Sequence, residues 1–249
     1  MVRLNSLRIG NYEVSYSWST IGQALPAMER KGFQLCSLKD IAKLRIAEMI
    51  LKEEKKISLF DNGPILIKEA ILCTPSNPPK ARLIKNSPFL EPYIKFIPEQ
   101  GIVIEPYKLV KQTDLIRDDG RSFRDRIVSE LGKTNFFPTM NQTIRSLENA
   151  IEFPIEEQAC LGRFIATEDF KKDGLVSSIF GAFLDLYKES LIRSEIKGIR
   201  IYPEFSEGMK IFEWNFARQM VYGRDETADI CLHSILPLED TMYYIFGIK

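Results

Sequence analysis

The spacing of apolar residues indicates short strands at the start of the chain. Apolar and polar residues alternate over residues 7–16, and the turn dipeptide Gly10-Asn11 interrupts the alternation. This pattern predicts either a small hairpin or one interrupted strand. Ser19 or Thr20 can then begin a short helix that runs towards Arg30.

The following segment has the clearest helical pattern in the chain. Ser37 and Asp40 have the spacing of a capping box, with Asp where Glu or Gln is usual. The apolar residues that share one helical face after this cap are Ile41, Leu44, Ala47, Ile50 and Leu51. We therefore expect a helix with these apolar residues on one face.

Turn residues and prolines divide the next part of the chain. Residues 57–60 and 65–72 read as two strands around the turn sequence Asp61-Asn62-Gly63-Pro64, which predicts a hairpin. Between Pro75 and Pro106 lie seven of the 13 prolines. A proline has no amide hydrogen to donate inside a sheet, so we expect loop and edge strand here. Residues 102–110 predict one strand with Pro106 at an edge or bulge.

Helical spacing returns in the second half of the chain. It predicts helices over 122–131 and 140–151, and one long helix over 174–193 with a broad apolar face. Three C-terminal strands are expected over 199–205, 229–235 and 242–248, with a helix around 212–220 between the first two.

The irregular order of these elements indicates the fold class. Regular alternation of strands and helices would indicate a doubly wound parallel sheet, and this chain does not show it. We predict an α+β fold in which a mixed or mainly antiparallel sheet packs with several helices. Residues 1–249 are interpreted as a single domain, although lobes 1–74 and 107–249 joined by the proline-rich segment 75–106 explain the pattern about as well.

Composition and charge limit the classes of partner. The 34 basic and 34 acidic residues cancel, so no global positive field favours nucleic acid or an anionic membrane. The N-terminal residues do not resemble a secretory signal, the four cysteines lie far apart, and no apolar run is long enough to span a membrane. We expect a cytoplasmic protein with reduced thiols. The 30 isoleucines, against nine asparagines and seven glutamines, fit either a thermophilic source or AT-rich coding.

A single histidine, His233, excludes sites that need several imidazoles. Asp229, Cys231 and His233 alternate along a predicted strand and should therefore project from one sheet face. A thiol and imidazole on one face suggest a nucleophile and base, or ligands of a shared metal. We favour the simpler interpretation, in which Ile230 and Leu232 face the core and the other three lie on a polar or half-buried face.

Residues 117–126 combine four arginines and three aspartates at a turn before a predicted helix. Arg121, Arg124 and Arg126 could hold a phosphate or a protein partner. Asp118, Asp119 and Asp125 could bind Mg²⁺ or another divalent cation through their carboxylates. The interleaved signs also fit a solvated network of salt bridges, which we favour.

These observations leave two function classes. We expect a cytosolic binding or interaction protein, such as an accessory or regulatory subunit, with a protein partner or self-association and with no cofactor or metal assigned. The alternative is a divalent-metal-dependent phosphate or nucleic-acid hydrolase that uses Asp118, Asp119 or Asp125, so the question of enzymatic activity stays open. A nucleic-acid-binding module is disfavoured by the neutral charge.

Overall fold

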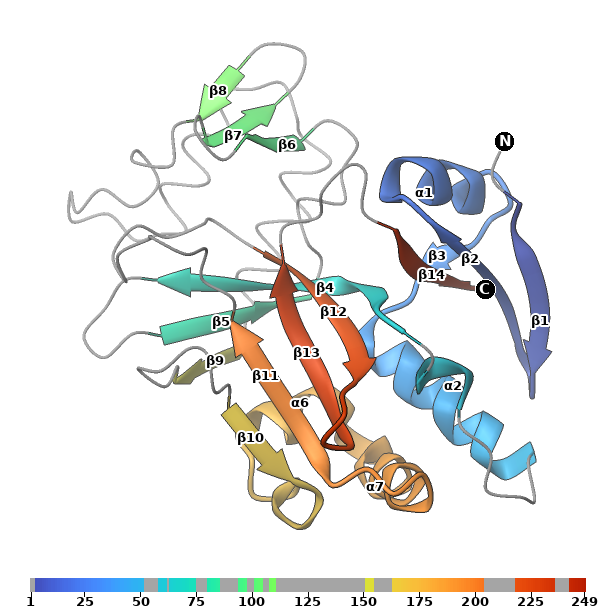
Figure 1. Ribbon diagram of the computed structural model, residues 1–249, viewed down its shortest axis with the longest axis vertical. Coiled ribbons are helices and arrows are strands. Elements are labelled where there is room, and N and C mark those ends of the chain that lie inside the picture. The colour runs from blue at the N-terminus through green and yellow to red at the C-terminus, as the bar shows by residue number, and fades with distance from the viewer. Residues whose placement is uncertain are drawn as a thin grey trace.

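A large mixed sheet forms the frame of the protein (Figure 1). The computed structural model describes residues 3–51, 58–61, 63–74, 80–85, 94–97, 101–104, 108–110, 151–154, 163–203, 218–235 and 242–249. Within them, an 11-stranded sheet has the main order β1-β2-β14-β4-β12-β13-β11-β10. The pairs β11/β13 and β14/β4 are parallel and the other described pairs are antiparallel. Together with the helices, this sheet confirms the predicted α+β class.

The N-terminal segment is a hairpin. Strands β1 (Asn5–Ile9) and β2 (Tyr12–Ser19) pair antiparallel around Gly10, which has a left-handed φ of 58°. Of the two predicted alternatives, the hairpin is therefore correct. Helix α1 (Ile21–Glu29) follows, and β3 (Gln34–Leu35) pairs with the C-terminal strand.

Helix α2 (Leu38–Leu51) has the predicted cap. The Ser37 amide donates to Asp40 Oδ2 at 3.0 Å, and the Asp40 amide donates to Ser37 Oγ at 3.1 Å. The apolar face of this helix is not buried along its whole length: at its C-terminal end Ile50 and Leu51 are 68% and 60% exposed. The charged residues Arg45 and Glu48 are buried in place of these apolar residues.

The predicted hairpin around residues 61–64 is also wrong. Leu59–Asp61 forms a short 3-10 helix, η1, held by a hydrogen bond from the Asp61 amide to the Ser58 carbonyl. Strand β4 (Ile65–Thr74) instead lies inside the sheet, with β14, β12 and β5 as partners.

The proline-rich span contains more regular structure than expected. Strand β5 (Lys80–Ile84) contains no proline and lies between β4 and β9 (Ile151–Pro154), so it is an inner strand. The start of β9 also replaces the predicted C-terminal end of the helix over 140–151.

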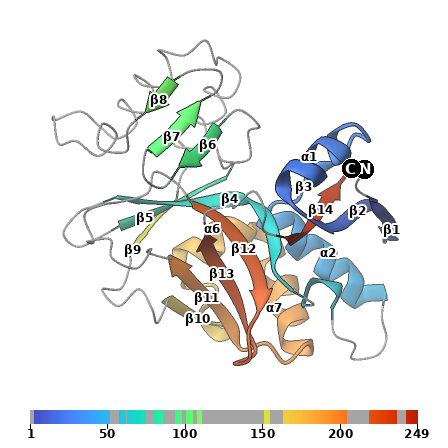
Figure 2. The same ribbon diagram turned by 45° about the horizontal axis from the view of Figure 1, so that its top comes forward.

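A small separate sheet follows β5 in sequence. It consists of β6 (Ile94–Ile97), β7 (Gly101–Ile104) and β8 (Lys108–Val110), and it stands beside the large sheet in Figure 2. The single strand predicted over 102–110 is therefore two antiparallel strands, and Pro106 lies outside the described residues.

The long helix predicted over 174–193 is interrupted. Helix α6 (Gly174–Phe180) ends at Gly181, whose left-handed φ of 52° no ordinary helical residue adopts. The 3-10 turn η4 (Gly181–Phe183) then leads into α7 (Leu184–Arg193). A further 3-10 turn, η3 (Thr167–Asp169), precedes α6.

The C-terminal strands complete the large sheet. Strands β11 (Gly198–Pro203), β13 (Asp229–Ile235) and β14 (Tyr243–Ile248) confirm the three predicted strands. Strand β12 (Arg218–Arg224) occupies the end of the segment where a helix was expected, and β10 (Arg163–Ala166) pairs with β11.

Helices cover both faces of the sheet, but unequally. The main core lies between one face and α2, α6 and α7, and includes Phe180, Tyr187 and Leu191. On the other face, a smaller core beneath α1 includes Met28, Leu66, Val221 and Ile245. None of the described helices is long and apolar enough to cross a membrane.

Candidate functional site

The strands β10, β11 and β13 present a polar and aromatic surface on the sheet face opposite the main core. Their inward side chains are buried: Ile165, Ile199, Ile201, Ile230 and Leu232. The alternate residues of these strands face the other way. In register across β10, β11 and β13 lie Phe164, Arg200 and Cys231, and across β11 and β13 lie the pairs Gly198 with Asp229 and Tyr202 with His233. This register places side chains from three separate segments on one surface.

The buried carboxylate of Asp229 holds Arg200 in place on this surface. The Asp229 side chain is 3% exposed and accepts hydrogen bonds from Arg200 Nη2 at 2.8 Å and Nε at 3.2 Å. Thr227 Oγ1 lies 2.8 Å from the same Asp229 oxygen. The ion pair therefore fixes the Arg200 guanidinium against β13 while leaving 24% of its side chain exposed.

The β12–β13 turn is held by Asp225. Its Oδ1 atom accepts from the amides of Thr227 and Asp229 at 2.9 and 3.0 Å, and from Thr227 Oγ1 at 2.7 Å. This arrangement supports the left-handed φ of 64° at Ala228, a conformation uncommon outside glycine. Burial alone would raise the pKa of Asp225, but hydrogen bonds from Thr227, Cys231 and the Asp229 amide outweigh burial and lower it.

Cys231 is unsuited to act as a nucleophile. Burial raises the pKa of its thiol to about 12, with further increases from the hydrogen bond to Asp225 and the charges of Asp225 and Asp229. The Sγ atom donates to Asp225 Oδ2 at 3.1 Å, and the residue is 2% exposed. Because the thiolate is the reactive form, Cys231 acts here as a structural donor.

The carboxylates of this surface are already engaged by other groups. The Arg200 guanidinium occupies the position beside Asp229 that a cation would need, and Asp225 already accepts several hydrogen bonds. No group of three or more potential metal ligands is present in the described part of the chain.

Aromatic rings form the rest of this surface, next to Arg200. The Phe164 ring lies 4.8 Å from the Arg200 guanidinium carbon and is 42% exposed. The Tyr202 and His233 rings stack with centroids 4.6 Å apart and an interplanar angle of 12°. Gly198 permits the Phe164 position, because a Cβ atom there would lie 2.6 Å from that ring. We call Phe164, Arg200, Tyr202 and His233 the sheet-face cluster.

The structure confirms the predicted faces of β13, whereas the arginine and aspartate segment is not among the described residues. Asp229, Cys231 and His233 share the polar face, while Ile230 and Leu232 face the core, as favoured above; on the polar face Asp229 and Cys231 are buried and His233 is half-buried. The residues of the arginine and aspartate segment lie outside the described residues: Asp118, Asp119, Arg121, Arg124, Asp125 and Arg126.

Sequence reasoning missed Phe164, Arg200, Tyr202 and Asp225. The alternation in Gly198–Pro203 gives a usable signal for Arg200 and Tyr202, because polar side chains alternate with isoleucines. Nothing in the sequence indicates that β11 pairs with β10 on one side and β13 on the other.

Comparison with known proteins supports the fold. No family model matches the chain, and no curated protein matches it. A structure solved in work on the accommodation of massive sequence variation in Nanoarchaeota by the C-type lectin fold is similar, with a TM-score of 0.51 and 12% sequence identity. The match covers 97% of this chain and 100% of that chain. At this identity the likeness concerns the fold alone.

Proposed function

We propose that this chain is a binding protein that holds a protein partner on the sheet-face cluster. The observation that carries the proposal is the contact between the exposed Phe164 ring and the Arg200 guanidinium. The buried carboxylate of Asp229 holds this guanidinium in place. Aromatic residues and arginine are the types most enriched in the centre of protein interfaces. A side chain that is already fixed loses little conformational entropy when a partner binds.

The chemistry of the described cluster favours binding over catalysis. Cys231 is held as a thiol by burial and by Asp225, and His233 stacks on Tyr202. Both arrangements stabilise the surface and provide no activated nucleophile. Under this proposal the protein acts as an accessory or regulatory subunit in the cytoplasm.

The similar structure supports the same proposal from a different direction. That work concerns a C-type lectin fold that accommodates massive sequence variation. A fold that tolerates such variation leaves many surface positions free of folding requirements. Exposed aromatic residues on this fold are then available to be selected for a partner.

The proposal is tested by affinity capture from the source cell with the wild-type protein and three variants. Phe164→Ser and Tyr202→Ala should each lose a partner that the wild-type protein retains. Trp18→Ala is the matched control, because Trp18 is an aromatic residue of similar exposure, 47%, on β2. The identified partner is then purified and its Kd measured against all forms by titration calorimetry.

Truncating an aromatic residue at the centre of an interface should weaken binding by about 2 kcal/mol or more, which is roughly thirtyfold in Kd. Equal affinity of the wild-type protein, Phe164→Ser and Tyr202→Ala would contradict the proposal. Circular dichroism of each variant establishes that the fold is retained.

A further inference from the structure

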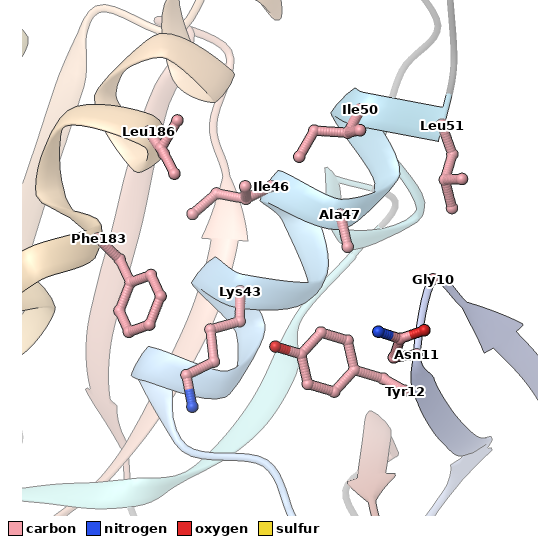
Figure 3. Close-up of a pocket in the computed structure, with 10 residues that line it drawn as sticks. All are labelled: Gly10, Asn11, Tyr12, Lys43, Ile46, Ala47, Ile50, Leu51, Phe183 and Leu186. Carbon is pink, nitrogen blue, oxygen red and sulfur yellow. The ribbon is translucent and has the colours of Figure 1, made fainter.

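A second surface, separate from the sheet-face cluster, lies over the outer side of α2. It is a groove of about 320 Å³ between the β1–β2 turn, α2 and the η4–α7 segment (Figure 3). The residues that line it are Gly10, Asn11, Tyr12, Lys43, Ile46, Ala47, Ile50, Leu51, Phe183 and Leu186. Its walls are therefore mainly apolar.

Apolar residues at the C-terminal end of α2 and on the facing helix α7 are exposed. Ile50 and Leu51 are 68% and 60% exposed, and Leu186 on the facing helix is 44% exposed. Exposed apolar side chains that are contiguous mark interaction surfaces more often than isolated ones do. Burial of Arg45 and Glu48 turns the apolar end of α2 towards solvent, so this surface follows from the packing of the helix.

The residue spacing on α2 fits a second helix. Lys43, Ile46, Ala47 and Ile50 have the i, i+3, i+4, i+7 spacing that forms a four-residue hole for a side chain of a partner helix. Ala47 is the smallest side chain of these four and lies next to Gly10 of the β1–β2 turn, where an added Cβ would be 3.8 Å from the Ala47 Cβ. Tyr12 and Leu51 lie on one side of it and Phe183 and Leu186 on the other (Figure 3).

One end of the groove carries positive charge. The Nζ atoms of Lys39 and Lys43 lie 5.5 and 5.6 Å from the centroid of the Phe183 ring. Asp40 lies 3.7 Å from Lys43, whereas Lys39 has no ion pair within the described residues. The nearby acidic residues of α7 are already paired, Asp185 with Lys171 and Glu189 with Arg193. The groove is thus complementary to an apolar surface with carboxylates at one end.

We propose that this groove docks an amphipathic helix of a partner protein. Apolar side chains of that helix pack into the hole around Ala47 and against Ile50, Leu51 and Leu186. A carboxylate on the same helix pairs with Lys39 and Lys43. This mode of recognition is a helix laid in an apolar groove, and it does not depend on the sheet-face cluster.

The test uses two fluorescein-labelled helical peptides of about 18 residues, a length at which helices form in water. Both carry leucines at i, i+3, i+4 and i+7. One carries glutamates beside the leucine stripe, and the other carries lysines at the same positions. Fluorescence anisotropy measures their Kd for the full-length protein and its variants.

The wild-type protein should bind the glutamate peptide at least about tenfold more tightly than the lysine peptide. Ile50→Asp and Leu51→Asp should abolish binding, while Lys39→Glu combined with Lys43→Glu should reverse the charge preference. Ile192→Asp is the matched control, since Ile192 is a 53% exposed residue of α7 that does not line the groove. The Ile192→Asp protein should bind like the wild-type protein.

Five results would overturn the proposal. Three of them concern the peptides: neither peptide binds, both peptides bind with equal affinity, or Ile192→Asp loses binding as much as Ile50→Asp does. A fourth is dimerisation of the wild-type protein in sedimentation experiments that Ile50→Asp abolishes. The last result would assign the groove to a second copy of the chain. Adsorption to phosphatidylglycerol vesicles in place of the peptides would likewise assign it to a lipid surface.

Discussion

The buried ion pair between Arg45 and Asp61 is expected to be the most sensitive polar contact in the described core. Arg45 Nη1 and Nη2 donate to the two Asp61 oxygens at 2.5 and 3.1 Å, and Arg45 Nη1 lies 3.4 Å from the Tyr222 hydroxyl. The two charged side chains are 2% and 1% exposed. The pair joins α2 to η1 and, through Tyr222, to β12.

Asp61→Ala removes the only carboxylate that faces the Arg45 guanidinium in the described contacts. The remaining charge would be buried with the Tyr222 hydroxyl alone, and Arg45 Nε already has no acceptor. Breaking a buried pair by removing one partner costs about 3–5 kcal/mol. For a chain of this length that corresponds to a fall in Tm of roughly 6–20 °C.

The assay is equilibrium urea unfolding, with Tm measured by calorimetry. The double variant Arg45→Met with Asp61→Ala should recover much of the loss, because replacing both charged side chains by apolar ones avoids the desolvation of both charges. Glu189→Ala is the control, since the Arg193–Glu189 pair is 58% and 49% exposed and should contribute about 0.5 kcal/mol or less. A cost below about 1 kcal/mol for Asp61→Ala would refute the reasoning, as it would show that the pair is not dehydrated.

Three further predictions concern the site and the cap of α2. Gly198→Ala should lower stability by about 1–3 kcal/mol in urea unfolding, because the new Cβ would lie 2.4 Å from the Ile165 carbonyl oxygen; Gly174→Ala, where a Cβ meets nothing within 4 Å, is the control. In native protein at pH 8, iodoacetamide should leave Cys231 unmodified by mass spectrometry, because its pKa is raised to about 12 by burial and Asp225, and rapid labelling would contradict this. Burial raises the pKa of Glu69, which accepts the Leu38 amide, from 4.5 to about 8, so folding takes up a proton between these values. The stability advantage of the wild-type protein over Glu69→Gln should therefore fall as pH rises from 4.5 to 8, and an advantage that stays constant or grows would show that Glu69 is ionised throughout.

The sequence determined the elements whose signals are local. The Ser37 and Asp40 cap predicted the start of α2, and Gly10-Asn11 indicated the first turn. Alternation along residues 229–235 correctly assigned Ile230 and Leu232 to the core and Cys231 and His233 to the other face. These patterns depend on hydrogen bonds and side-chain directions within a few residues.

Only the tertiary structure decided which residues meet across the sheet. Strand β11 pairs with β13 and β10, so Phe164, Arg200 and Asp229 come together although they are separated in sequence. The tertiary structure also decided how α2 is oriented. Two of its charged residues face inward, because Arg45 donates to Asp61 and Glu48 accepts from Ser58. Those long-range contacts bury charged residues and expose Ile50 and Leu51.

The physical reason is that periodicity defines a face without defining its partner. A helix with apolar and charged residues on adjacent faces can rotate towards either, and the choice depends on whether distant groups satisfy the charges. Local patterns therefore established the strands, the helix starts and the polar face that contains His233. The pairing of distant strands and the burial of Arg45 established both the sheet-face cluster and the groove over α2.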